Sequence, residues 1–348
     1  MNKLLGLLGV FAVLGTAATA SWATPPGKNG DIAFRRYLDA KRTTGAIFTI
    51  RPDGTGIRQV TRPPRGVIDQ YPDMSPDGKT IVFHRMVPCP PGGGKDGIDR
   101  TCDLVYTVRR DGQGLRPLVP CAFKATDASG RIVPDACVGA HTPAWSRDGS
   151  KIAFSYSLVN EEWSGASLKL RRGIWIVNAD GSDPRRVTQL EPSTSWDDEP
   201  QFSPDGKKLV FTRVDLARQK DAVFTVNVDG SGLAQLTPWA LNAAGDPEWS
   251  PDGKWIVFTA PSPGNVYKVR PDGTRLTNLT KQKAGGFQYL SSSFSPDGRW
   301  IVSSRTPGAG PDGHADLLVM RPDGSRIRLL TETRLWESSV DWGPRIAP

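Results

Sequence analysis

An all-β fold made from one repeated unit is the fold class that the sequence predicts, and three features predict it. Glycine and proline are abundant in the 348 residues, with 37 and 30 copies, which suits a chain with many tight turns. A phrase centred on Ser-Pro-Asp-Gly recurs along the chain, each time followed by β-branched and aromatic residues. No stretch shows the apolar period of an amphipathic helix, so helices should be scarce.

The first 23 residues are predicted to be a secretory signal peptide. Lys3 supplies a positive charge, Leu4–Leu14 is almost purely apolar, and a run of small residues follows. Cleavage after Ala20 and cleavage after Ala23 both fit this pattern. A retained membrane anchor is the alternative, and the shortness of the apolar stretch disfavours it. We therefore expect residues 24–348 to form one mature domain without a membrane span, either secreted or in the periplasm or cell envelope.

The first repeated phrase predicts a short strand, a turn and a second strand. Its copies cover residues 71–83, 142–154, 199–211, 246–258 and, in shorter form, 293–302. In the Ser-Pro-Asp-Gly turn, proline presets its own φ and glycine accepts the positive φ that closes the hairpin. The run after the turn, Ile-Val-Phe or a variant of it, has the composition of a strand.

A second phrase lies between these copies and predicts two more strands per unit. It is a β-rich run, then Asp-Gly, then a polar stretch that ends in an apolar residue, usually followed by threonine. Its six Asp-Gly pairs begin at Asp53, Asp111, Asp180, Asp229, Asp272 and Asp323. Because a four-stranded unit cannot bury both faces alone, six of them should stack radially. The sequence therefore predicts a six-bladed β-propeller.

The two ends of the chain predict how this ring closes. The first unit begins at its second strand, near Ile32–Phe34, and its missing first strand appears at the far end, around Val340–Trp342. Pairing of these segments would remove an open sheet edge. We therefore expect the C-terminal strand to complete the first blade.

These phrases resemble the TolB-like β-propeller repeat over nearly all of residues 30–344. That pattern runs Pro-x-Trp-Ser-Pro-Asp-Gly-Lys-x-Ile-x-Phe, then Asp-Gly and Leu-Thr. TolB itself carries an α/β domain ahead of the propeller, and the sequence leaves only a few residues between the expected cleavage site and the first strand. Similar repeats cap prolyl-oligopeptidase-type peptidases, but this sequence has no Gly-x-Ser-x-Gly elbow. The resemblance implies the fold, and we expect neither a Tol–Pal role nor peptidase activity.

Four cysteines are expected to form two local disulfides. An even number of cysteines in an exported chain favours disulfides. Proximity along the sequence favours Cys89–Cys102 and Cys121–Cys137. Zinc is the alternative, which the absence of Cys-x-x-Cys pairs disfavours.

The three histidines are expected to be solvated or to lie in turns. His84, His141 and His314 fall in different repeats, so nothing in the sequence brings them together. We therefore expect no metal site and no cofactor.

One residue per repeat should line the central channel. Strand alternation places it opposite the large side chain before Ser-Pro. The channel set is Asp73, Ala144, Gln201, Glu248, Ser293 and Asp341, and the large residues, expected to pack between blades, are Met74, Trp145, Phe202, Trp249, Phe294 and Trp342. Three of the channel residues are acidic and none is basic. Asp73, Gln201, Glu248 and Asp341 are thus candidate binding residues for a cation, an amine, or a lysine or arginine of a partner. Alternatively, the carboxylates accept hydrogen bonds from backbone amides or water.

The sequence favours a binding or scaffold function over catalysis. The formal charge of +8 could suit nucleic acid, but export and the lack of a recognition motif exclude it. We expect a monomer whose partner is an envelope or extracellular protein or glycan. The alternative is an extracellular enzyme, a glycan lyase, a hydrolase or a lactonase, with its site at the channel mouth.

Overall fold

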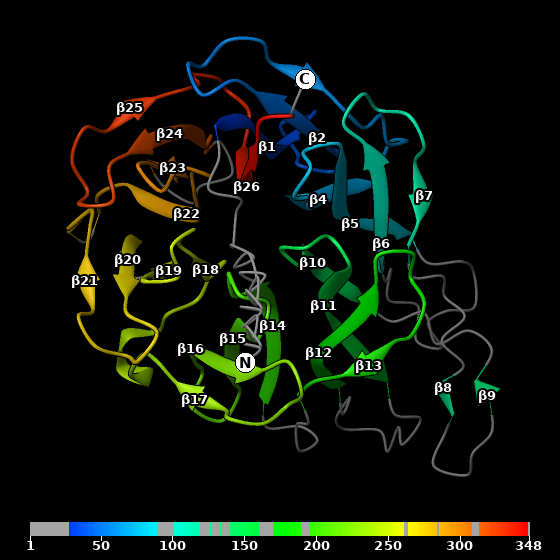
Figure 1. The fold of residues 1–348 in the computed structure, drawn as a ribbon. Coiled ribbons are helices and arrows are strands. Elements are labelled where there is room, and N and C mark those ends of the chain that lie inside the picture. The colour runs from blue at the N-terminus through cyan, green and yellow to red at the C-terminus, as the bar shows by residue number, and fades with distance from the viewer. Residues whose placement is uncertain are drawn as a thin grey trace, which may run out of the picture.

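The computed structural model describes residues 28–88, 101–118, 125–126, 132–133, 139–159, 170–188, 195–260, 264–283, 285–307 and 313–346. Their strands form sheets arranged in a ring around a central axis (Figure 1). The one helix in these residues is the 3-10 turn η1 (Trp239–Leu241), in line with the missing helical period. Among the described residues, no helix has the length and apolar character needed to span a membrane. Residues 1–23 lie outside the described residues, so the signal peptide stays a prediction.

Four repeats form separate four-stranded antiparallel sheets whose strands follow chain order. Each runs from a strand at the axis to a two-residue strand at the rim (Figure 1). The sheets are β10–β13 (Ala140–Trp145, Lys151–Val159, Leu170–Asn178, Arg185–Arg186), β14–β17 (Ser195–Phe202, Lys208–Asp215, Lys220–Asn227, Ala234–Gln235), β18–β21 (Glu248–Trp249, Ile256–Ala260, Asn265–Val269, Thr277–Asn278) and β22–β25 (Gln288–Phe294, Ile301–Thr306, Asp316–Met320, Arg328–Leu329).

The first two repeats form one eight-stranded sheet, so the predicted count of six four-stranded blades is wrong. Its order is β26-β1-β2-β4-β5-β6-β7, with β3 also paired to β2. The physical cause is one parallel pair between β2 and β4, Gly45 with Ile68, where the Gly45 amide donates to the Val67 carbonyl at 3.2 Å. The strands are β1 (Asn29–Tyr37), β2 (Gly45–Ile50), β3 (Arg58–Gln59), β4 (Ile68–Met74), β5 (Thr80–Pro88), β6 (Thr101–Arg109), β7 (Arg116–Pro117) and β26 (Glu337–Pro344); β8 (Ala125–Thr126) and β9 (Ile132–Val133) form a separate pair.

The predicted closure of the ring is confirmed. β26 pairs antiparallel with β1, placing Trp342 opposite Ile32 and Asp341 opposite Ala33. The Trp342 indole Nε1 also donates to the Gly30 carbonyl at 3.2 Å. The two ends of the chain therefore belong to one sheet.

The repeated motifs are accounted for by local hydrogen bonds. In the first Ser-Pro-Asp-Gly turn, the Ser75 hydroxyl donates to Asp77 Oδ1 at 2.6 Å and accepts from the Thr80 amide at 2.9 Å. Gly78 takes the left-handed conformation, with φ of 70°, that closes the turn. The threonine that ends the second phrase works similarly, since Thr61 Oγ1 accepts from the Ile47 amide at 2.9 Å. These residues specify turns and the position of the fourth strand.

The core is divided into six hydrophobic clusters that lie between successive repeats. Trp342, for example, packs with Phe34 of its own sheet and with Val302 and Leu317 of the preceding one. The large residue before Ser-Pro was predicted to pack between blades, and this is confirmed for all six, each of which belongs to or packs against a different cluster: Met74, Trp145, Phe202, Trp249, Phe294 and Trp342.

Candidate functional site

The six predicted channel residues lie at equivalent positions, one on each strand nearest the axis. We call Asp73, Ala144, Gln201, Glu248, Ser293 and Asp341 the inner ring. Each is paired with a residue of the next strand in its own sheet. Asp73 is paired with Val82, and Glu248 is paired with Val257. Four of them, Asp73, Gln201, Glu248 and Asp341, line the two cavities that follow each other along the axis. The prediction from strand alternation therefore placed these side chains correctly.

The inner-ring carboxylates bind backbone amides of the next strand around the axis. Asp341 Oδ2 accepts from the Met74 amide at 2.8 Å, and Asp73 Oδ1 accepts from the Trp145 amide at 2.9 Å. Glu248 Oε1 accepts from the Phe294 amide at 3.2 Å. The structural alternative, in which the carboxylates accept backbone hydrogen bonds, is thus confirmed for all three. Gln201 instead donates to Asp73 Oδ2 at 3.1 Å.

Burial makes these carboxylates weaker acids than usual. Desolvation raises the pKa of Asp73 to about 6, against the hydrogen bonds from Trp145 and Gln201. It also raises the pKa values of Glu248 and Asp341 well above the usual range, and the negative charge of a neighbouring carboxylate adds to both shifts. A positive charge in the channel would reverse this effect.

Arg147 supplies such a charge, and sequence reasoning missed it. It replaces the proline of the Ser-Pro-Asp-Gly turn in the third repeat and lines the end of the channel beyond the inner ring. Burial lowers its pKa to about 9, opposed by the charges of Asp73, Glu248 and Asp341, so it remains protonated at neutral pH. The only visible signal in the sequence was this break in an otherwise regular motif.

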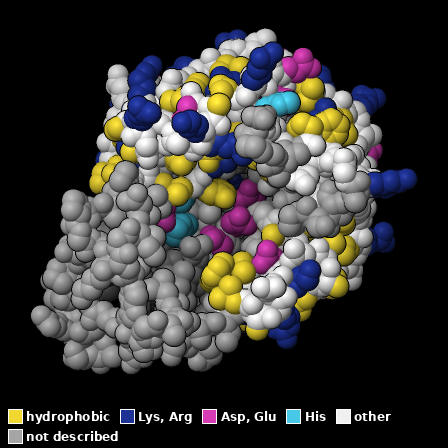
Figure 2. All heavy atoms as spheres, turned by 180° about the vertical axis from the view of Figure 1, so that it is seen from behind, with side chains coloured by type: hydrophobic (Ala, Val, Ile, Leu, Met, Phe, Trp, Pro, Cys, Tyr) yellow, Lys and Arg dark blue, Asp and Glu magenta, His cyan; other side chains and the backbone are white. Residues whose placement is uncertain are grey.

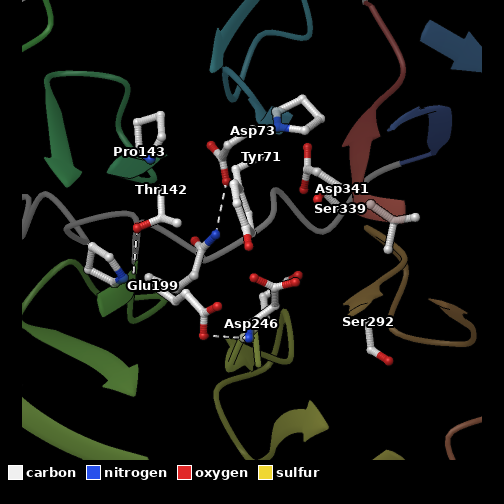
Figure 3. A pocket seen from close by; sticks show the side chains of 14 residues that line it. Tyr71, Asp73, Thr142, Pro143, Glu199, Asp246, Ser292, Ser339 and Asp341 are labelled. Atoms are coloured by element: carbon white, nitrogen blue, oxygen red, sulfur yellow. Dashed lines mark hydrogen bonds between the residues drawn. The ribbon is translucent and has the colours of Figure 1, made fainter. Parts of the chain in front are cut away.

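A second set of residues surrounds the other end of the channel. We call Tyr71, Thr142, Glu199, Asp246 and Ser339 the mouth ring, because they line the first cavity and precede the inner ring by two residues in each strand (Figure 3). All five have positive φ, between 43° and 56°. Such backbone is rare outside glycine and especially unfavourable for a β-branched residue such as Thr142. At four of them, Asp246 excepted, the strand pairing shifts register, as in a β-bulge.

Three carboxylates crowd one side of the mouth ring. Glu199 Oε2 accepts from the Asp246 amide at 2.9 Å and from the Thr212 hydroxyl at 3.1 Å. The adjacent Asp198 Oδ1 accepts from the Thr142 hydroxyl at 2.8 Å and the Glu199 amide at 3.0 Å. Figure 2 shows Asp and Glu side chains gathered in a hollow near the centre of one face, with Lys and Arg on the surrounding surface.

Burial, and then crowding, raise the pKa values of Asp246 and Glu199. Burial, and then the charge of Asp198, raise the pKa of Asp246 to about 7, while Arg35 opposes the shift. Burial and the charges of Asp246 and Asp198 raise the pKa of Glu199 well above its usual range. Arg35 is held by Gln70 and Ser338. The mouth is therefore an acidic site whose charge changes in the physiological pH range.

Two of the three histidines lie together, contrary to the sequence expectation. His84 is buried rather than solvated, and His84 and His141 both contact Asp103. Adjacent repeats bring them together, which no local sequence signal reveals. His314 is 42% exposed beside Asp316, as expected for a solvated histidine.

The predicted disulfides fall largely outside the described residues. Cys89, Cys121 and Cys137 are not described, whereas the backbone of Cys102 lies in β6 opposite Val87. Both pairings, Cys89–Cys102 and Cys121–Cys137, stay predictions.

Comparisons with known proteins agree with the fold. Residues 142–348 match the family described as the TolB beta propeller domain. An oligogalacturonide lyase from Pectobacterium atrosepticum is 21% identical over 197 residues, which are 54% of this chain and 44% of that protein, so the chain spans less than half of this curated relative.

Two solved structures show that the same fold serves different proteins. TolB from Acinetobacter baumannii has a TM-score of 0.61 at 19% identity, covering 91% of this chain and 67% of that one. Hydrazine synthase from Kuenenia stuttgartiensis has a TM-score of 0.63 at 14% identity, covering 91% and 48%. At these identities the likeness establishes the fold alone. The family match extends over more than half of the chain, and this protein therefore belongs to the TolB beta propeller domain family.

Proposed function

We propose that this protein is a non-enzymatic binding module that accepts a positively charged group, a lysine or arginine side chain of a partner protein, at the mouth ring. The observation that carries the proposal is that Glu199 and Asp246 line a cavity close to each other and to the charge of Asp198, in a chain with a formal charge of +8. Local charge of one sign in a concave site attracts and orients a ligand of the opposite sign.

The two ends of the channel differ in what they can accept. Arg147 already lies among the inner-ring carboxylates at the far end. A cationic group entering there would meet this guanidinium, whereas at the mouth it meets carboxylates first. Entry from the mouth is therefore favoured.

Protonation couples this binding to pH. Asp246, with a pKa of about 7, is partly protonated at neutral pH, and a bound cation favours its ionised form. Binding should release a proton and become tighter as the pH rises from 6 to 8.

Calorimetry with a short peptide tests this proposal. The probe is acetyl-Gly-Gly-Arg-Gly-Gly-amide, and the same peptide with citrulline in place of arginine is its neutral control. We expect at least tenfold weaker binding of the citrulline peptide, and at least tenfold loss of arginine-peptide binding in E199Q. The matched variant E332Q, which changes an exposed glutamate outside the channel, should bind as the parent does. Equal binding of both peptides, or unchanged binding by E199Q, would refute the proposal.

We also propose that the chain acts outside the cytoplasm. The apolar run and small residues at the N-terminus support export. Mass spectrometry of the protein from its native cells should find an N-terminus at Ser21 or Thr24.

A glycan-cleaving enzyme is the second candidate, favoured by the sequence similarity to oligogalacturonide lyase. Against it, the acidic mouth would repel a polyanionic uronide. Incubation with oligogalacturonides, followed by ultraviolet absorbance of an unsaturated product, tests this candidate directly. Turnover that disappears in E199Q would replace the binding proposal with an enzymatic one.

A further inference from the structure

We infer that His84, Asp103 and His141 form a binding site for one divalent transition-metal ion of the zinc class. The three side chains come from three strands, β5, β6 and β10, and therefore from two neighbouring repeats. Their potential ligand atoms lie within 4.8 Å of one another. The site stands independently of the proposed mouth-ring function.

The sheet register accounts for the first two ligands. Met86 in β5 is paired with Asp103 in β6, and His84 lies two residues before Met86 on the same face. Asp103 is thus the diagonal cross-strand neighbour of His84, and its Oδ1 lies 2.8 Å from His84 Nε2. This pairing is built into the backbone of one sheet.

The third ligand comes from the next sheet around the axis. His141 Nε2 lies 3.5 Å from Asp103 Oδ2, and the His141 and His84 rings meet edge to face at 5.0 Å. Gly139 makes room for this ring, since a Cβ at that residue would lie 2.2 Å from His141 Nε2. A metal ion here would add a link between two sheets that already meet through side-chain packing and the hydrogen bond from the Trp145 amide to Asp73.

The distances and the donor set suit a four-coordinate metal. With metal–ligand bonds of about 2.0–2.2 Å, tetrahedral ligand atoms lie about 3.4 Å apart, between the 2.8 and 3.5 Å observed here. Two imidazoles and one carboxylate form a common ligand set for Zn²⁺ and related ions, and they leave one position open for water or substrate.

Surrounding groups hold the histidine that is most deeply buried. The side chain of His84 is 3% exposed, and those of Asp103 and His141 are 15% and 12% exposed. Gln70 Nε2 lies 3.4 Å from His84 Nδ1, and the Tyr71 ring stacks on the imidazole at 6.2 Å. These two contacts limit rotation of the imidazole ring, whose Nε2 faces Asp103.

Metal titration of the purified chain, first treated with a chelator, tests this inference. Calorimetry with ZnCl₂ and visible absorbance with CoCl₂ should each show one equivalent bound per chain, with cobalt bands typical of tetrahedral coordination. Zinc should also raise the Tm by several degrees, because it binds the folded state.

Variants locate the ion. D103N and H141A, at the two partly exposed ligands, should each weaken zinc binding at least tenfold, whereas H314A should bind as the parent does, because His314 lies outside this cluster, beside Asp316. Circular dichroism of each variant without metal confirms folding. Absence of stoichiometric binding by the parent would overturn the inference. So would unchanged binding in folded D103N and H141A, or loss in E199Q instead, which would place the ion at the mouth ring.

Discussion

The inner ring and the mouth ring are built from the same repeat, two residues apart, yet their carboxylates have opposite surroundings. In the inner ring, each carboxylate accepts a hydrogen bond from a backbone amide of the neighbouring strand, and Arg147 adds a positive charge. These carboxylates belong to Asp73, Glu248 and Asp341. In the mouth ring, Glu199 and Asp246 lie close to each other and to Asp198. Equivalent positions of one repeat therefore form an inner ring that joins the blades and a mouth ring that can bind a positively charged group.

Backbone geometry separates the two rings in the same way. The inner-ring residues lie on ordinary extended strands, whereas all five mouth-ring residues have positive φ. Strained backbone persists where surrounding structure enforces it, and it is found disproportionately at ligand sites. The periodicity of the repeat therefore identifies which residues face the axis. The groups that surround each of these residues determine its charge and its hydrogen bonds.

Removing the C-terminal strand, which contributes one residue to each ring, should have the largest effect. Deletion of residues 337–348 takes away β26, including Ser339, Asp341 and the buried Trp342, and exposes an edge of the first sheet. We expect loss of the cooperative thermal transition in circular dichroism, and aggregation in size-exclusion chromatography. Deletion of residues 345–348 alone, outside the strand, is the control and should leave the Tm nearly unchanged. A cooperative transition within a few degrees of the parent after the longer deletion would contradict the closure.

Loss of the inner-ring cation should have the next largest effect. R147M leaves three buried carboxylates without their positive neighbour, and breaking a buried charge arrangement costs on the order of 3 kcal/mol. The cost should be greater at pH 8 than at pH 5, because at pH 5 the carboxylates with raised pKa values take up protons. Urea unfolding at both pH values measures it. R299M, at an exposed arginine after another copy of the turn, should change the free energy of unfolding by less than about 0.5 kcal/mol. An equal loss in both variants would show that Arg147 acts merely as a surface residue.

The sequence was sufficient for the features that depend on local chemistry and strand alternation. It placed the turns, the closure by Val340–Trp342, the aromatic residues between repeats and the six inner-ring positions. The sequence did not reveal contacts between side chains of different repeats. Arg147 crosses into the channel from a turn, and His84 meets His141 only because their repeats are adjacent.

Two further features could not be predicted from the repeats, for different reasons. The eight-stranded sheet arises from one pair, Gly45 with Ile68, which depends on a small difference in position between otherwise equivalent strands. The mouth ring did leave a signal, since Tyr71, Thr142, Glu199 and Asp246 all precede the proline of the repeated phrase. Strand alternation does predict that residues two positions apart face the same side of a strand. The sequence did not reveal the positive φ values of the mouth-ring residues.

The pH dependence of stability should distinguish one ring from the other. A carboxyl whose folded pKa is raised stabilises the native state fully below its unfolded pKa, near 4, and this contribution is lost as the pH rises through the folded pKa. For Asp246 that window extends from about pH 4 to pH 7. D246N should therefore match the parent at pH 4 and be more stable by about 4 kcal/mol at pH 8. Urea unfolding across this range measures the difference.

The inner-ring variant D73N provides the contrast. Asparagine has one acceptor oxygen, so it cannot keep the bonds from both the Trp145 amide and the Gln201 side chain. We expect a loss of about 1 kcal/mol already at pH 4, because one of these two hydrogen bonds is lost whatever the charge of the parent carboxyl. If D246N instead lost stability at pH 8, the crowding of carboxylates at the mouth would not be unfavourable, and the two rings would be equivalent.

The smallest expected effect tests the backbone strain of the mouth ring alone. Ser339 has φ of 53°, a region in which a side chain costs about 1–2 kcal/mol and glycine none. Glycine also adds about 0.5–1 kcal/mol of unfolded-state entropy, so S339G should stabilise the fold by about 0.5 kcal/mol. S292G, at a neighbouring channel residue without positive φ, should instead destabilise by about 1 kcal/mol, because it loses both chain stiffness and the hydrogen bond to Ser303 at 3.0 Å. Opposite signs in urea unfolding would establish that the mouth ring stores strain. Destabilisation by S339G as large as that by S292G would mean that its positive φ costs nothing, and the contrast between the two rings would then rest on charge alone.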